Sequence, residues 1–143
     1  MAIKQLSVFV GNKAGSLSEA AELLAAQGID LRAMSIADTS DYGIVRLIVD
    51  DPEKASQIFS DNGIISTVTE ICAFAVPDVP GGLANALRIL SDNGINIEYL
   101  YSLVTSKAGK AFAVMRVADN AAAEQVLTAN GIEVATVQDI ANI

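Results

Sequence analysis

Apolar residues alternate with other residues over two short stretches of the chain, residues 6–10 and 72–76. A period of two is typical of a β-strand that buries one face. The sequence therefore predicts a strand in each stretch. The alternating apolar positions are Leu6, Val8, Val10, Cys72, Phe74 and Val76.

A helical spacing follows each of these strands. Apolar residues recur every three or four positions over residues 17–24 and 83–90, as expected for half-buried helices. A second pair of helices is predicted after Asp51-Pro52 and after Asp119, because Asp is a favourable N-cap and Pro suits the first helical position. The helical apolar positions are Leu17, Ala20, Ala21, Leu24, Ala55, Ile58, Phe59, Leu83, Ala86, Leu87, Leu90, Ala122, Ala123, Val126 and Leu127.

The pentapeptide Ser-Asp-Asn-Gly-Ile occurs twice, at residues 60–64 and 91–95. Gly-Ile also closes apolar stretches at Gly28 and Gly131. Glycine accepts the left-handed conformation that follows the last turn of many helices, and an apolar residue after it often packs back onto that turn. The pattern therefore predicts four helix ends.

The first helix end is nearly as far from the third as the second is from the fourth. Gly28 to Gly94 is 94 − 28 = 66 residues, and Gly63 to Gly131 is 131 − 63 = 68 residues. At these two offsets many apolar residues of the first half match those of the second. We interpret this as an internal duplication of a unit that contains two helices.

Each copy also contains a hairpin and a last strand. Residues 29–37 with 43–49, and 95–104 with 111–117, predict the hairpins, and residues 66–71 and 134–140 predict the last strands. The order is then β-α-β-β-α-β, the ferredoxin-like arrangement of an antiparallel sheet with helices on one face. The fold class is α+β, with domains at residues 1–70 and 71–143.

The connection between the copies and the composition of the strands give two further expectations. No Gly, Pro or Ser-rich linker separates the copies, so the last strand of one is expected to continue into the first strand of the other. Residues 43–49 and 111–117 are apolar on both faces apart from Arg46 and Arg116, which implies cover on the face away from the helices. The other copy or a second chain could supply that cover.

The charge balance excludes some classes of partner. Nine basic and seventeen acidic residues give a net charge of −8, which disfavours binding to nucleic acid. Charged residues interrupt every long apolar stretch, so neither a signal peptide nor a membrane span is expected. These features predict a cytoplasmic protein that does not bind membranes.

Most catalytic and metal-binding chemistry is also disfavoured. The chain has no His and one Cys, Cys72, which lies in a predicted strand with Phe74 and Val76 on the same face. Cys behaves there as a small hydrophobic residue, so we interpret it as a core residue rather than a reactive thiol. No catalytic residue, metal site or cofactor is predicted.

The loops before the first helix of each copy are Gly-Asn-Lys-Ala-Gly-Ser-Leu at residues 11–17 and Pro-Asp-Val-Pro-Gly-Gly-Leu at residues 77–83. A helix N-terminus offers unpaired N–H groups and a positive dipole end to a carboxylate. Asn12 or Asp78 could accept hydrogen bonds from an ammonium group. The glycines could instead serve only the turn into the helix.

The second copy resembles the ACT domain, whose pattern is Asp or Asn, then Pro-Gly-x-Leu, and a helix that closes with Gly-Ile-Asn-Ile. The first copy has Ala14 where the family usually has Pro and Asp30 where it often has Asn. The resemblance covers essentially the whole chain and is greatest to small proteins made of two ACT domains. The residues that carry it are Asp78, Pro80, Gly81, Leu83, Gly94, Ile95, Asn96 and Ile97 in the second copy, and Asn12, Gly15, Leu17, Gly28 and Ile29 in the first.

The resemblance implies binding of an amino acid where two ACT domains meet, each site pairing one loop with the start of the second strand of another copy. Leu31, Ile97 and Tyr101 favour an apolar or aromatic ligand, and Asp78 makes the two sites unequal. Asp30 and Asn96 could instead cap a turn, and Tyr101 could serve packing. The implied ligand-binding residues are Asn12, Lys13, Ala14, Gly15, Ser16, Leu17, Asp30, Leu31, Ile36, Asp78, Val79, Pro80, Gly81, Gly82, Leu83, Asn96, Ile97, Tyr101 and Ser102.

Three functions remain open at this point. The first is a non-catalytic amino-acid sensor, a homodimer through sheet edges or faces, that regulates an enzyme of amino-acid metabolism in trans. The second is a ligand-independent module that oligomerises or docks a metabolic enzyme. The third is a small enzyme, which the absence of His and of paired carboxylates disfavours.

Overall fold

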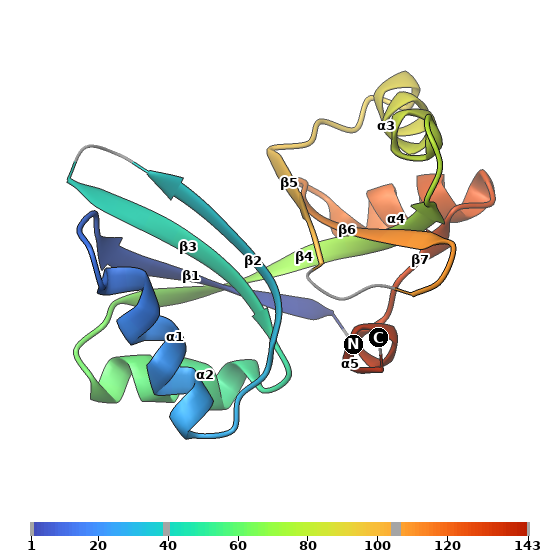
Figure 1. Ribbon diagram of the computed structural model, residues 1–143. Coiled ribbons are helices and arrows are strands. Elements are labelled where there is room, and N and C mark those ends of the chain that lie inside the picture. The colour runs from blue at the N-terminus through green and yellow to red at the C-terminus, as the bar shows by residue number, and fades with distance from the viewer. Residues whose placement is uncertain (1, 39–40, 104–106, 143) are drawn as a thin grey trace. The chain divides into compact units, whose positions relative to one another are not determined.

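The computed structural model describes residues 2–38, 41–103 and 107–142 (Figure 1). The chain divides into two compact units. The first unit is Lys4–Thr69, and the second comprises the chain from Glu70 onward together with the N-terminal residues up to Ile3. Each unit has its own sheet, helices and hydrophobic core.

The first unit contains β1 (Ile3–Gly11), α1 (Ser16–Ala26), β2 (Leu31–Asp38), β3 (Tyr42–Val49), α2 (Pro52–Asp61) and the start of β4 (Ser66–Pro77). Strand β3 lies between β1 and β2 and is antiparallel to both, with Leu47 opposite Leu6 on one side and Met34 on the other. The N–H of Phe9 donates to the carbonyl of Ile65 at 3.0 Å on the other edge of β1. This is the predicted β-α-β-β-α-β order.

The second unit repeats this order. It continues β4 and adds α3 (Gly82–Asp92), β5 (Tyr99–Ser102), β6 (Lys110–Arg116), α4 (Asn120–Ala129), β7 (Glu133–Val134) and α5 (Val137–Ala141). Strand β6 is antiparallel to both β4 and β5, and β7 pairs with β4. The predicted ferredoxin-like α+β fold is confirmed, and β4 is the single continuous strand expected between the copies.

All four predicted helix ends have the same hydrogen bonds. At the end of α3, the N–H of Gly94 donates to the carbonyl of Ser91 at 3.0 Å, and that of Ile95 to the carbonyl of Leu90 at 2.9 Å. This pair of bonds is the Schellman motif, which requires a left-handed residue such as Gly94, with φ of 74°. The repeated Asn-Gly-Ile sequences therefore arise because each helix ends in this way.

Each unit buries an apolar core between its sheet and its two helices. The cores use matching positions of the two copies, at offsets of 66 and 68. Each core has one buried phenylalanine, but at different positions, Phe59 in the first and Phe74 in the second; their counterparts are Leu127 and Val8. The buried residues are Leu6, Val8, Ala20, Leu24, Ile29, Val45, Leu47, Val49, Ala55 and Phe59 in the first core, and Cys72, Phe74, Val76, Ala86, Leu90, Ala113, Met115, Val117, Ala123 and Leu127 in the second.

The prediction of a strand over residues 134–140 is wrong. Strand β7 is only Glu133–Val134, and the chain then forms α5. The hydroxyl of Thr136 accepts from the N–H of Asp139 at 3.1 Å, and the Asp139 carboxylate accepts from the N–H of Thr136 at 2.8 Å. This capping box begins a helix in an otherwise strand-like apolar stretch.

The strand predicted from residue 95 also begins later than expected. Strand β5 starts at Tyr99, because Ile95 and Ile97 pack against the core of the second unit instead of continuing an extended strand. Ile95 also supplies the last hydrogen bond of the Schellman motif.

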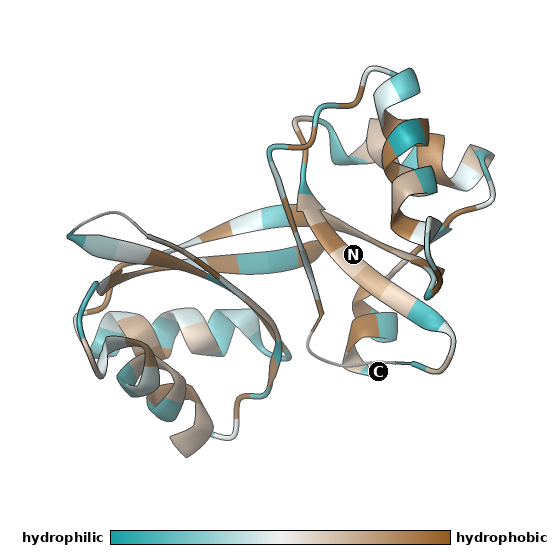
Figure 2. Ribbon diagram, turned by 45° about the horizontal axis from the view of Figure 1, so that its top comes forward, coloured by the Kyte–Doolittle hydropathy of each residue, from teal (hydrophilic) through white to brown (hydrophobic). Residues whose placement is uncertain are grey.

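The outer face of the second unit's sheet is buried, as its apolar composition predicted. Phe112 and Val114 alternate with core residues along β6, so they face away from α3 and α4, yet both are buried. Helix α5 lies on this side of the sheet in Figures 1 and 2, and its Ile140 is buried. The C-terminal helix therefore contributes cover that the sequence did not suggest.

Candidate functional site

The two loops before α1 and α3 are held by the same four backbone hydrogen bonds. In the first loop these run from Asn12 to Asp41 at 3.3 Å, Lys13 to Gly11 at 3.0 Å, Ser16 to Lys13 at 3.3 Å and Glu19 to Gly15 at 2.9 Å, with the N–H donor named first. In the second loop they run from Asp78 to Gly109 at 3.0 Å, Val79 to Pro77 at 2.9 Å, Gly82 to Val79 at 3.0 Å and Asn85 to Gly81 at 3.0 Å. Each loop is therefore anchored both to its hairpin and to its helix.

The helices that follow these loops begin without a side-chain cap in the described structure. Gly15 and Gly81 are the N-cap residues, with φ of 90° and 87°. The next backbone N–H groups, those of Leu17 and Ser18 in α1 and of Leu83 and Ala84 in α3, have no hydrogen-bond partner among the described residues. Both helix starts thus offer free donors at a positive dipole end.

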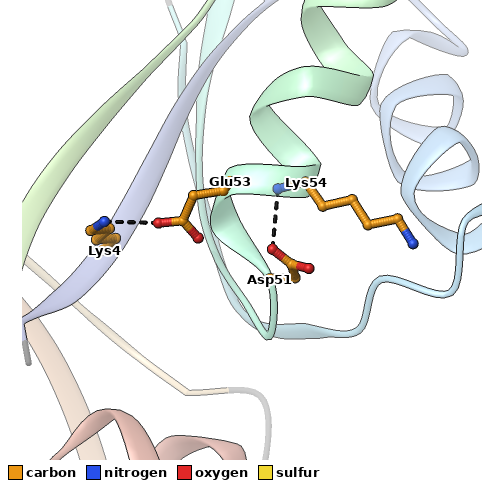
Figure 3. A network of polar contacts seen from close by, with 4 residues as sticks. All are labelled: Lys4, Asp51, Glu53 and Lys54. Carbon is orange, nitrogen blue, oxygen red and sulfur yellow. Dashed lines mark hydrogen bonds and ion pairs between the residues drawn. The ribbon is translucent and has the colours of Figure 1, made fainter.

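Helices α2 and α4 differ in this respect. The Asp51 carboxylate accepts from the N–H of Lys54 at 3.1 Å (Figure 3). The Asp119 carboxylate accepts from the N–H of Ala122 at 3.0 Å. The first turn of α2 is also linked to β1, where the Lys4 ammonium donates to Glu53 at 2.8 Å and lowers the pKa of that carboxyl. The helices outside the predicted site therefore cap their own N-termini.

The exposed side chains of the two loops carry different charges. Asn12 and Lys13 of the first loop occupy the positions of Asp78 and Val79 in the second, and all four are exposed. The first loop is thus positively charged and the second negatively charged on the same backbone frame. Most of the other predicted loop residues are also exposed: Ala14, Gly15 and Leu17 in the first loop, and Pro80, Gly81 and Leu83 in the second. Ser16 and Gly82 are partly buried.

Gly82 is required by close packing and not by its φ angle. A Cβ atom built on Gly82 would lie 2.2 Å from the carbonyl oxygen of Pro77, far inside van der Waals contact. The equivalent residue of the first loop is Ser16, whose Oγ lies 3.5 Å from the position that a Cβ of Gly11 would occupy. Apart from the matching Gly15 and Gly81, the first loop has its other glycine at the start, Gly11, and the second has it at the helix, Gly82.

The predicted residues at the very start of the second strand lie far from the loop of their own unit, whereas Ile36 and Ser102 lie further along the strand, opposite Val45 and Ala113. On β3, Tyr42 is opposite Gly11 and Val49 is opposite Leu31, so seven residues, or about 23 Å, separate the two ends. On β6, Lys110 is opposite Pro77 and Arg116 is opposite Tyr99, which is six residues or about 20 Å. A loop and a strand start of one unit cannot contact the same small molecule.

Three of these strand residues have structural partners. The N–H of Asp30 donates to the Asp50 carboxylate at 3.1 Å, and the Asp30 carboxylate lies 3.4 Å from Nε of Arg32. Leu31 and Ile97 pack against the two hydrophobic cores. Their main contribution is therefore to the fold of each unit.

Other predicted strand residues are more accessible. Asn96 and Ser102 are exposed, and Ile36 is 53% exposed on β2. Tyr101 is partly buried and stacks on Tyr99 with ring centroids 6.3 Å apart. Sequence analysis did not identify Asp41 and Gly109, whose carbonyls accept the hydrogen bonds that anchor the two loops to their hairpins. The two residues occupy equivalent positions at the offset of 68, and this equivalence could have identified them.

Cys72 is a core residue, as predicted. Its side chain is 1% exposed, and burial, with a smaller contribution from the Glu124 carboxylate, raises the pKa of the thiol to about 12. Within residues 2–38, 41–103 and 107–142, no cluster of three or more acidic or Cys side chains could hold a metal ion. None of the helices formed by these residues is long and apolar enough to cross a membrane.

The raised pKa predicts that Cys72 resists thiol reagents in the folded protein and reacts rapidly in urea. Since the folded pKa exceeds the ordinary value of about 9, the thiol favours folding below pH 9, and this contribution is lost as the pH rises from about 9 towards 12. Absorbance after addition of a chromogenic disulfide measures the reaction. The control, Cys72→Ala with Ile65→Cys, places the thiol at a position that is 70% exposed and should react in the native state. Rapid reaction of native Cys72 would contradict the core assignment.

Comparison with known proteins identifies the family of this two-copy arrangement. The family model of the ACT domain pair matches residues 1–143. The chain belongs to this ACT domain pair family. The resemblance predicted from the two loops and helix ends is confirmed over the full sequence.

Solved structures agree with this assignment. The ACT domain pair is similar to protein BT0572 from Bacteroides thetaiotaomicron, with 37% identity, a TM-score of 0.92, and coverage of 100% of this chain and 98% of the other. The fold is shared with the ligand-free regulatory subunit of aspartate kinase from Thermus thermophilus, with 14% identity, a TM-score of 0.68, and coverage of 90% and 93%. It is shared with aspartate kinase from Synechocystis at 23% identity and a TM-score of 0.61, covering 95% of this chain and 27% of that enzyme. No curated protein matches the sequence.

Proposed function

We propose that this ACT domain pair is a non-catalytic regulatory protein that binds an amino acid at an interface between ACT domains. It would act in trans, as a homodimer, on an enzyme of amino-acid metabolism. The observation that carries the proposal is the pair of uncapped helix starts, each held by the same hydrogen bonds and each with two free N–H donors. Such donors suit a carboxylate.

The carboxylate and the ammonium group of an α-amino acid would bind to different groups of the loop. In the second loop, the N–H groups of Leu83 and Ala84 would bind the carboxylate, and Asp78 would accept from the ammonium group. The strand starts of a second ACT domain would complete the site, because each strand start lies about 20 Å or more from the loop of its own unit. The ACT domains proposed here are residues 1–70 and 71–143.

The two loops should differ in affinity. Lys13 beside the first helix start would strengthen binding of a carboxylate but repel an ammonium group. Asp78 beside the second would do the reverse. We therefore propose that the second loop binds a zwitterionic amino acid with an apolar or aromatic side chain, which the exposed Val79 and the half-buried Tyr101 of the partner subunit would contact.

Thermal unfolding in the presence of each of the twenty amino acids at several millimolar tests this proposal. A ligand at about 100 times its Kd adds about 2.7 kcal/mol of stability. For a chain of this size each kcal/mol raises Tm by about 2–4 °C. We expect one amino acid, or a small chemically related group, to raise Tm.

Matched variants locate the binding site. Asp78→Asn removes the charge near the ammonium group and should abolish the shift. Asn96→Ala removes the strand-start amide that the partner subunit would supply in the homodimer and should weaken the shift. Asp92→Asn makes the same charge change at an exposed position at the opposite end of α3 and should leave the shift intact. No shift with any amino acid would refute the sensor and favour a ligand-independent docking module.

A further inference from the structure

Three of the four Schellman helix ends carry the dipeptide Asn-Gly: Asn62-Gly63 on α2, Asn93-Gly94 on α3 and Asn130-Gly131 on α4. All six residues are exposed to solvent. The fourth end, on α1, has Gln27-Gly28 instead. Asn-Gly is the dipeptide most prone to spontaneous loss of the side-chain amide, because glycine has no Cβ to obstruct ring closure.

The chemistry of this loss needs two groups to be free. The backbone nitrogen of Gly loses its proton and attacks Cγ of Asn, and a five-membered imide forms. The bond from Cγ to Nδ2 breaks, and that nitrogen leaves as ammonia with the proton. Water then opens the imide at either carbonyl and leaves aspartate or isoaspartate, so no other reactant is required.

Both groups are occupied at each of the three helix ends. Nδ2 of the Asn donates to the carbonyl four residues earlier, that of Ile58, Ile89 or Val126, at 2.8 Å in every case. The N–H of the following Gly donates to the carbonyl of Ser60, Ser91 or Thr128 at 3.1, 3.0 and 3.1 Å. The attacking nitrogen and the leaving amide are therefore held in separate hydrogen bonds.

We propose that Asn62, Asn93 and Asn130 are latent deamidation sites that the helix C-termini keep closed. Each site reacts only when its own helix end opens, so the rate at each Asn reports local opening. The helix ends do not depend on one another, because the bonds that close each one involve only residues of its own helix and the three residues that follow it.

The product should prevent the helix end from closing again. A carboxylate cannot donate to the carbonyl that Nδ2 contacted, and it places negative charge at the negative end of the helix dipole. Three such events would change the net charge from −8 to −8 − 3 = −11. Two of the three sites lie in the second unit, so that unit is the more vulnerable to this change.

Peptide mass mapping during incubation at mildly alkaline pH tests the proposal. The full chain is compared in buffer and in urea. We expect each of the three Asn residues to deamidate at least tenfold more slowly in the folded protein, which corresponds to about 1.4 kcal/mol of opening. Gln27 should stay unchanged in both, because its ring would need six members. Equal rates in buffer and urea at the three sites would overturn the proposal.

Two matched variants separate local from global opening. Ile132→Ala removes the side chain that packs behind the end of α4, and Ile64→Ala does the same behind α2. The first should accelerate deamidation at Asn130 more than at Asn62, and the second should do the reverse. If either variant accelerates all three sites equally, the helix ends do not open independently and the local mechanism is wrong.

Discussion

Replacing Gly82 with alanine is expected to lower the free energy of unfolding by about 1–3 kcal/mol, the usual cost of an added methyl group in a filled space. The new Cβ would lie 2.2 Å from the carbonyl oxygen of Pro77, and neither is the end of a flexible side chain. The loop backbone must move, which breaks the hydrogen bonds from Gly82 to Val79 and from Val79 to Pro77. Urea unfolding followed by circular dichroism measures the change.

The first loop provides the matched control. Ser16 occupies the position of Gly82 and already carries a Cβ atom, so Ser16→Ala should change stability by no more than about 0.5 kcal/mol. The Gly82→Ala variant should also lose the amino-acid-dependent rise in Tm, because the displaced loop carries the N–H groups of Leu83 and Ala84. An equal effect of the two substitutions would show that the loops are packed alike, contrary to the structure.

The duplication and most of the fold could be predicted because the same local physics acts twice. The four Gly-Ile sequences predict helix ends, since the left-handed glycine and the apolar residue after it are both required by the Schellman motif. The alternation at Leu6 and Val8 and at Cys72 and Phe74 identifies matching strands, and the structure buries these residues in matching cores. Local patterns suffice where only one face of an element is buried.

The errors occur where a local signal competes with the apolar pattern. Residues 134–140 have a strand-like composition, but the reciprocal hydrogen bonds of Thr136 and Asp139 begin a helix there. The Thr-x-x-Asp spacing was visible in the sequence, yet its effect depends on a partner surface for Ile140 that only the fold supplies. The start of β5 was misplaced for a similar reason, because Ile95 and Ile97 belong to the core.

The candidate site was only partly predictable. The sequence places Gly81 and Gly82 in a turn before a helix, but it does not show that one glycine serves its φ angle and the other a contact with Pro77. It also does not show that Asp30 is held by Asp50 and Arg32. These facts depend on the distances between segments that are far apart in the chain.

Truncating Phe59 to alanine should have the largest effect of any substitution considered, about 3–5 kcal/mol of unfolding free energy. Phe59 is 0% exposed and is the only phenylalanine of the first core as described, so its removal leaves a cavity among Val8, Leu24 and Leu47 and their neighbours. The backbone of α2 is held at its start by the Asp51 cap and cannot easily collapse into the space. Urea unfolding measures this loss.

The second core shows how the first could be rebuilt. It places its phenylalanine at position 74, the counterpart of Val8, and has leucine at position 127, the counterpart of Phe59. Val8→Phe alone should overfill the first core and Phe59→Leu alone should leave it underfilled, whereas the double variant reproduces the second arrangement. We expect the double variant to be more stable than the sum of the two single changes by about 0.5–3 kcal/mol.

The control is the exposed pair Ile65→Ala and Gln57→Ala, which lies outside the core. The changes in unfolding free energy of these two substitutions should be additive. If the core pair is also additive, positions 8 and 59 do not share one space, and the two copies must fill their interiors by different packing.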